Sequence, residues 1–146
     1  MPSSELKQLK KRLLAEGFEI YRSAEASLRL ADRVRENLIM DGQVSAEVDP
    51  LAVVFVTRAQ RSECGGLGEA SLFESARQLG HPGLARGYSE ESARTLEIPD
   101  PGDRSRVLDT WYEVSFRKLV AGTEELAEEL RFALRLEKTV RPLRAQ

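Results

Sequence analysis

An unbroken run of six apolar residues at positions 51–56, LAVVFV, most constrains how this 146-residue chain can fold. The run follows an Asp49-Pro50 turn and is rich in the β-branched and aromatic side chains that favour strands. It is far shorter than the roughly 20 apolar residues that a bilayer span needs. Because neighbouring side chains of a strand point to opposite faces, the run predicts a central strand covered on both faces or nearly so.

Three other segments, 18–22, 94–98 and 107–119, alternate apolar and polar residues and predict strands, and a short alternating segment lies between Val44 and Val48. The polar turn at 99–105 predicts a hairpin between the second and third of them. Along the third, the face predicted to meet the core carries Leu108, Thr110, Tyr112, Val114 and Phe116. The residues predicted to face away are Asp109, Trp111, Glu113, Ser115 and Arg117.

Three segments predict helices. Residues 4–16 and 69–79 carry apolar side chains at helical spacing and end at Gly17 and Gly80, and a third helix begins at about 122 with an acidic first turn. The stretch 23–40 is rich in Ala, Glu, Leu and Arg, so we expect mostly helix there, ending at Asp41-Gly42. The alternative is a hairpin through residues 18–30 followed by a shorter helix from Asp32.

These elements predict an α+β fold in two layers, an antiparallel sheet of about four to six strands with three to four helices packed on it. We expect one domain over residues 1–146 with a flexible tail from about 140. Under the hairpin alternative, the order of elements resembles that of bacterial secretion-chaperone-like and YbjN-like domains. This resemblance, which is one of element order, implies an adaptor or chaperone role.

Composition excludes several classes of protein. Lys and Arg number 22 against 24 Asp and Glu, and the net charge of −2 argues against a general polyanion binder. A single cysteine excludes an intramolecular disulfide and fits a reducing compartment, and we find neither a signal peptide nor a membrane span. We therefore expect a cytoplasmic protein without membrane partners.

A glycine-rich turn at 62–68 connects the predicted central strand to a helix, and there Cys64, Gly65, Gly66 and Gly68 form a candidate ligand or phosphate site. The alternative is a flexible connection, because no second parallel strand follows the helix and Glu63 and Glu69 bring negative charge. Cys64 with His81 would be a nucleophile and base, but the helix of 69–79 separates them by roughly 16 Å. We expect no metal site, because one His and one Cys do not complete one, and we expect no cofactor.

Two surfaces are candidates for binding macromolecules. Basic residues on the first two predicted helices, Lys7, Lys10, Lys11, Arg12, Arg29, Arg33 and Arg35, could face RNA, as could Arg58 and Arg61 after the central strand. Trp111 on the outer sheet face, with Phe132 and Leu136 off the main stripe of the last helix, could bind a protein partner. The alternative for Trp111 is that a helix covers it.

The sequence therefore favours a non-enzymatic protein-interaction module, adaptor-like or chaperone-like, that binds another protein or forms a homodimer. Two alternatives stay open. One is an enzyme acting on a small ligand or phosphate at the 64–68 loop, and the other is an RNA-binding domain that uses the basic residues of the first two helices.

Overall fold

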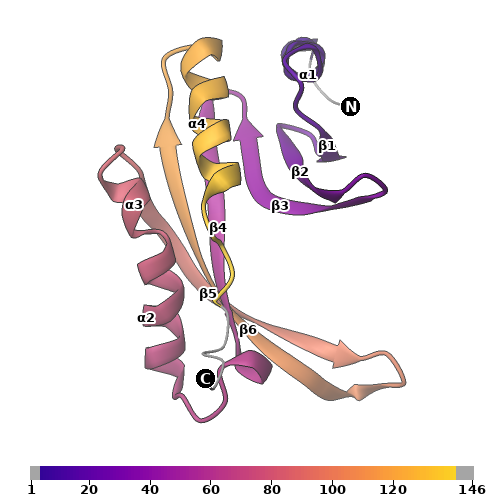
Figure 1. The fold of residues 1–146 in the computed structure, drawn as a ribbon, viewed down its shortest axis with the longest axis vertical. Coiled ribbons are helices and arrows are strands. Elements are labelled where there is room, and N and C mark those ends of the chain that lie inside the picture. The colour runs from indigo at the N-terminus through magenta and orange to yellow at the C-terminus, as the bar shows by residue number, and fades with distance from the viewer. Residues whose placement is uncertain (1–3, 141–146) are drawn as a thin grey trace. The chain divides into compact units, whose positions relative to one another are not determined.

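The computed structural model describes residues 4–140 of the chain. Over these residues a six-stranded antiparallel sheet, of strand order β1-β2-β3-β4-β6-β5, combines with four α-helices, which confirms the predicted two-layer α+β class (Figure 1). The elements are α1 (Ser4–Ala15), β1 (Ile20–Ser23), β2 (Ser27–Arg35), β3 (Leu38–Glu47), β4 (Ala52–Gln60), the 3-10 helix η1 (Arg61–Glu63), α2 (Glu69–Leu79), α3 (His81–Leu84), β5 (Ser89–Asp100), β6 (Asp103–Leu119) and α4 (Thr123–Arg135). None of these helices is long and apolar enough to cross a membrane.

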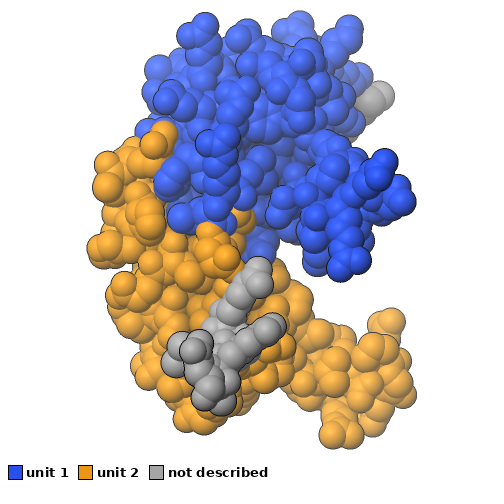
Figure 2. Space-filling model, viewed as in Figure 1, with its two compact units in different colours: residues 1–55, 117–136 blue, residues 56–116, 137–146 orange. Residues whose placement is uncertain are grey.

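The chain divides into two compact units, coloured separately in Figure 2. Unit 1 holds the described residues up to Phe55 together with Arg117–Leu136, and unit 2 holds Val56–Phe116 together with the described residues from Glu137 onward. The strands β4 and β6 therefore each contribute to both units. The expectation of one domain stays a prediction, and most of the predicted tail, residues 141–146, lies outside the described part of the chain.

Unit 1 has its core between the sheet and two amphipathic helices. The inward stripe of α1 is Leu6, Leu9 and Leu13, spaced three and four residues apart as one helix face requires, and all three are buried. Helix α4 buries Leu126, Leu130 and Ala133 in the same way. The sheet residues that they help to cover include Leu28, Leu30, Val44, Ala46, Val53 and Phe55, each with no exposed surface.

The stretch 23–40 is not a helix, which corrects the first expectation for this region. It forms β2 and the start of β3, and β2 pairs antiparallel with β1 on one side and β3 on the other. The hairpin alternative was right for residues 18–30, but no helix follows from Asp32. Burial favours the strand over the helix here. In a strand, residues two apart point to the same face, so Leu28 and Leu30 both enter the core, whereas a helix would turn one of them away from it.

A bulge bends β3 at Gly42 and Gln43. Leu30 pairs with Val44 while the next residue, Ala31, pairs with Asp41, so two residues of β3 have no partner on β2. Gln43 has a positive φ of 57°, and its backbone N–H donates to Asp41 Oδ1 at 2.8 Å. A Cβ at Gly42 would lie 2.8 Å from a methyl group of Leu134 of α4 and 3.0 Å from the carbonyl oxygen of Leu30, so the glycine lets α4 pack closely on the bulge. Residues 32–41, beyond the bulge, form a two-stranded extension that we call the β2–β3 arm (Figure 1).

Unit 2 is built on the remaining parts of β4 and β6 with β5 and helix α2. Leu72 and Ala76 of α2 are buried, as are Tyr112, Val114 and Phe116 of β6. The ring of Phe73 meets that of Tyr112 edge-to-face at 5.1 Å between centroids. The prediction of α2 is confirmed, as is the inward face of β6 at Tyr112, Val114 and Phe116, whereas Glu113, predicted to face solvent, is buried.

Three further details of unit 2 differ from the sequence expectations. The segment 81–91, which no predicted helix or strand covers, contains α3 and the start of β5. The β5–β6 turn is confined to Pro101 and Gly102, since Pro99 and Asp100 still belong to β5. Leu108 is 59% exposed instead of buried, because it lies where β5 and β6 run on as a two-stranded hairpin.

Candidate functional site

The glycine loop before α2 is an open connection. Gly68 is the N-cap residue of α2 without a side-chain cap, and Gly66 adopts a positive φ of 88°, which explains the glycine there. A Cβ placed on Gly65, Gly66 or Gly68 would meet no atom within 4 Å. The three glycines therefore do not line a tight cavity in which only bare backbone fits, and the ligand site predicted for this loop stays a prediction.

Cys64 lies half-buried at the end of η1. Burial raises the pKa of its thiol, and the nearby carboxylates of Glu63 and Asp109 raise that pKa further, although a backbone hydrogen bond at Gln60 opposes them. A nucleophilic cysteine needs the opposite shift, toward the thiolate at neutral pH. His81, in α3 beyond the far end of α2, is not among the groups that influence the Cys64 thiol.

Asp109 of β6 ties the start of this loop to the sheet. Its carboxylate accepts the backbone N–H of Ser62 at 2.9 Å, the Ser62 hydroxyl at 2.7 Å and the Trp111 Nε1–H at 3.0 Å. Burial raises the pKa of Asp109, but the hydrogen bonds from Ser62, Thr110 and Trp111 outweigh it, and the net pKa lies below the usual 3.8. The carboxylate is thus held ionised as an acceptor.

Glu113 is the most deeply buried carboxylate of β6, and two arginines hold it. Its Oε2 accepts hydrogen bonds from Nε and Nη2 of Arg58, on β4, at 2.9 and 2.7 Å. Its Oε1 accepts Nη2 of Arg94 from β5 at 3.2 Å. Glu113 is 5% exposed and Arg58 18%, whereas Arg94 is largely in solvent. This cluster joins three neighbouring strands, and its carboxylate is occupied on both oxygens, so it serves to fix the sheet.

Trp111 lies beside this cluster and is half-buried. The Arg58 guanidinium covers its ring, with the guanidinium carbon 4.0 Å from the ring centroid. Arg58 is itself held in place by residues 138–140, because its backbone N–H donates to Lys138 O and its carbonyl accepts the N–H of Val140. Trp111 thus faces away from the core as predicted, but an arginine covers it in place of a helix.

The other two residues predicted to bind a partner belong to a different unit. Phe132 of α4 and Leu136, which follows the helix as its C-cap residue, are both half-buried in unit 1, while Trp111 is in unit 2. The three side chains are therefore divided between the two units, and neither unit carries all three on its surface. Their assignment to a partner stays a prediction.

The basic residues expected to lie on a second helix lie on β2 instead. Arg33 donates to Glu19 Oε1 at 2.7 Å, and Arg29 lies 3.5 Å from Asp41 Oδ1. Ion pairs of this kind remove much of the local positive charge that RNA would need. Arg61 likewise donates to the Tyr112 hydroxyl and lies over its ring.

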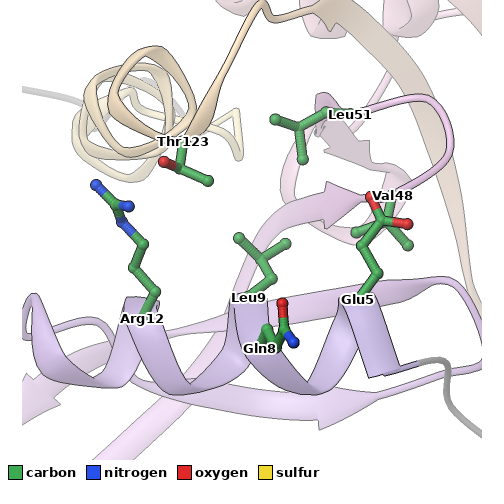
Figure 3. A pocket seen from close by; sticks show the side chains of 7 residues that line it. All are labelled: Glu5, Gln8, Leu9, Arg12, Val48, Leu51 and Thr123. Atoms are coloured by element: carbon green, nitrogen blue, oxygen red, sulfur yellow. The ribbon is translucent and has the colours of Figure 1, made fainter.

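A shallow pocket of about 270 Å³ lies in unit 1 between α1, the β3–β4 turn and the first residue of α4 (Figure 3). Leu9, Val48 and Leu51 form its apolar part, with Glu5 and Arg12 at its rim. Its volume is at the small end for ligand sites, and Arg12 is paired with Glu16 at 3.6 Å. Of the residues predicted as sites, Arg12, one of the basic residues predicted to face RNA, is the one that lines it.

The most unusual surface is one that sequence reasoning missed, the β2–β3 arm. Residues 32–41 are all exposed, and four of them are large apolar side chains, Val34 at 52%, Leu38 at 44%, Ile39 at 43% and Met40 at 53%. Figure 2 shows this part of unit 1 standing out in solvent. The signal in the sequence was the triplet Leu38-Ile39-Met40 next to Asp41-Gly42, which the helix interpretation hid.

Among residues 4–140 no group of three or more His, Cys, Asp and Glu side chains is arranged to hold a metal ion. The chaperone-like resemblance in element order stays a prediction. Comparisons of the chain with models of protein families, with curated proteins and with solved structures found no match.

Proposed function

We propose that this chain is a non-enzymatic protein-interaction module, adaptor-like or chaperone-like, and that the β2–β3 arm is its binding surface. The observation that carries the proposal is the exposure of Val34, Leu38, Ile39 and Met40 within one two-stranded arm. Single exposed apolar residues are ordinary, whereas several on one protruding element mark an interaction site. An isolated hairpin is also only marginally stable in water, so contact with a partner would stabilise the arm.

The non-enzymatic part of the proposal is supported by the chemistry of the other candidates. The raised pKa of Cys64 disfavours a thiolate nucleophile, and the carboxylate of Glu113 is occupied by Arg58 and Arg94. The arm offers apolar area and unpaired strand edge but no acid, base or nucleophile in a cavity. A cytoplasmic location belongs to the same proposal, because a single half-buried cysteine suits a reducing compartment.

Site-specific photo-cross-linking tests the proposal. A photoreactive phenylalanine analogue replaces Ile39 in the full chain, expressed in its native host, and a matched chain carries the analogue at Leu84, an exposed apolar residue of α3. We expect a discrete protein adduct from position 39 that is absent from position 84. Equal adducts from both positions, or none from position 39, would contradict the proposal.

A further inference from the structure

The strand edges of the sheet differ in how they are protected from pairing with another strand. At one side β1 is only four residues long, and at the other the long edge strand β5 carries Glu90, Glu91, Arg94 and Glu97, with Pro99 near its end. Short length, charge and proline are the usual protections of an edge. The triplet Leu38-Ile39-Met40 in the arm carries neither a charge nor a proline.

The arm exposes one edge of β3. Pairing between β3 and β4 begins at Val44 opposite Phe55 and extends to Glu47 opposite Ala52. Over residues 38–41, β3 pairs with β2 alone, and within the described part of the chain no strand lies on its other side. The bulge at Gly42 and Gln43 turns this segment away from β4 and so leaves its outer edge open.

We propose that the occupant of this edge is a second copy of the chain, which pairs antiparallel with residues 38–41 about a two-fold axis. The inference rests on the proposed function and names its partner. Antiparallel pairing of identical segments is self-complementary, as a two-fold dimer requires. With Ile39 on the axis, Ile39 opposes its own copy and Leu38 opposes Met40 of the second copy, so every apolar residue of the triplet meets an apolar residue.

The polar residues of the arm agree with this register. Extended by one residue into the β2–β3 turn, the register brings Asn37 opposite Asp41 of the second copy, a pair that can form a hydrogen bond. The arm carries two positive side chains, Arg33 and Arg35, and three negative ones, Asp32, Glu36 and Asp41, so its net charge is −1 and two copies meet without strong repulsion. A strand from an unrelated protein would need to match this short apolar triplet and its polar neighbours, whereas a second copy does so by symmetry.

Sedimentation equilibrium of the purified full chain tests the dimer. We expect a reversible monomer–dimer equilibrium between roughly 1 and 500 μM, the range of transient interfaces. Ile39→Glu should weaken the association about tenfold or more, because it places a charge on the axis. Glu at position 39 stands opposite Arg33 of β2, which already donates to Glu19, and the positive charge of Arg33 limits the cost of the new carboxylate within the hairpin.

Two further variants complete the design. Leu84→Glu introduces the same charge at a similarly exposed residue outside the arm, and it should leave the association unchanged. Ile39→Thr keeps a β-branched residue in the strand and should weaken the dimer less than Ile39→Glu does. A chain that stays monomeric throughout, or equal weakening by Ile39→Glu and Leu84→Glu, would overturn the inference.

Disulfide trapping tests the register. In a Cys64→Ser background, Ile39→Cys should form a covalent dimer on mild oxidation, because directly opposed residues of antiparallel strands have Cβ atoms about 4.5–5.5 Å apart. Leu84→Cys, equally exposed, is the control for random collision. Equal rates for the two variants would overturn the two-fold pairing at Ile39.

The two proposals can fail separately. If position 39 cross-links to another protein in the host while the purified chain is strictly monomeric, the second copy is the wrong occupant and the arm is still a protein-binding surface. If position 39 gives no adduct and the chain is monomeric, both proposals fall.

Discussion

The guanidinium carbon of Arg58 lies 4.0 Å from the centroid of the Trp111 ring. The same guanidinium donates two hydrogen bonds to Glu113, so one arginine covers the outer face of the tryptophan and neutralises a buried carboxylate. The indole N–H of Trp111 in turn donates a hydrogen bond to Asp109. The same carboxylate accepts a hydrogen bond from the hydroxyl of Ser62 at the start of the 62–68 loop. A side chain that the sequence suggested as a partner anchor is therefore part of a contact network that orders unit 2.

Arg58→Ala should destabilise the chain by about 2–4 kcal/mol. Glu113 would lose the better buried of its two arginine partners, and the ring of Trp111 would lose the guanidinium that covers it. Arg94→Ala is the matched control and should cost less than about 1 kcal/mol, since Arg94 is 65% exposed. Urea unfolding followed by the fluorescence of the single tryptophan measures both. Equal losses for the two variants would show that Arg58 has no special role.

Acid should abolish the contribution of Asp109 to stability. Its pKa is lower in the folded chain than the usual 3.8, so its contribution is complete above the unfolded value and is lost as pH falls through the folded value. Asp109→Asn should therefore be less stable than the wild type at about pH 7, and the difference should shrink at about pH 2.5. Thermal unfolding at both pH values provides the comparison. A difference that is constant with pH would contradict the role of the ionised carboxylate.

Cys64 should react slowly with iodoacetamide while the chain is folded. The raised pKa of its thiol leaves less thiolate at about pH 7.5 than an unperturbed cysteine has. The unfolded chain in urea is the internal reference, and we expect faster alkylation there. Glu63→Gln should accelerate the folded reaction modestly, because it removes one of the charges that raise the pKa. Faster alkylation of the folded wild type than of the unfolded chain would revive the enzymatic alternative.

Gly80 should not tolerate a side chain. A Cβ at this position would overlap the ring of Phe116, which is 1% exposed and cannot move without disturbing the core of unit 2. Gly80→Ala should therefore cost about 1–3 kcal/mol. Gly65→Ala, where a Cβ meets nothing within 4 Å, is the control and should change stability little. The free energies of unfolding in urea measure the difference, and equal values would contradict this packing.

Much of the fold could be predicted because local patterns and burial agree. The apolar run at 51–56 becomes β4, between β3 and β6, and the periodic Leu6, Leu9 and Leu13 become the buried face of α1. The stretch 23–40 misled because its composition favours a helix, while its strand form depends on pairing with β1 and β3. The helix propensity of a residue is small, so the burial of Leu28 and Leu30 in the sheet outweighs it.

The candidate sites were harder to predict, because their partners are distant in sequence. Glu113 alternates with core residues and so was expected outside, yet it is buried because Arg58 and Arg94 approach it from β4 and β5. Nothing within its own strand indicates those two arginines. The arm was missed because its exposure follows from the bulge at Gly42 and Gln43, a feature that appears only once β2 and β3 are paired.

Hydrogen exchange of the amides in residues 32–41 tests most directly the claim that the arm pairs with another strand. In a free arm these exposed residues are bonded only within the hairpin and should exchange rapidly. We predict that protection of the 38–41 amides rises about tenfold or more as the full chain is concentrated through its dimer equilibrium, while the Ile39→Glu chain stays unprotected. Equally fast exchange at every concentration, in both chains, would contradict the account.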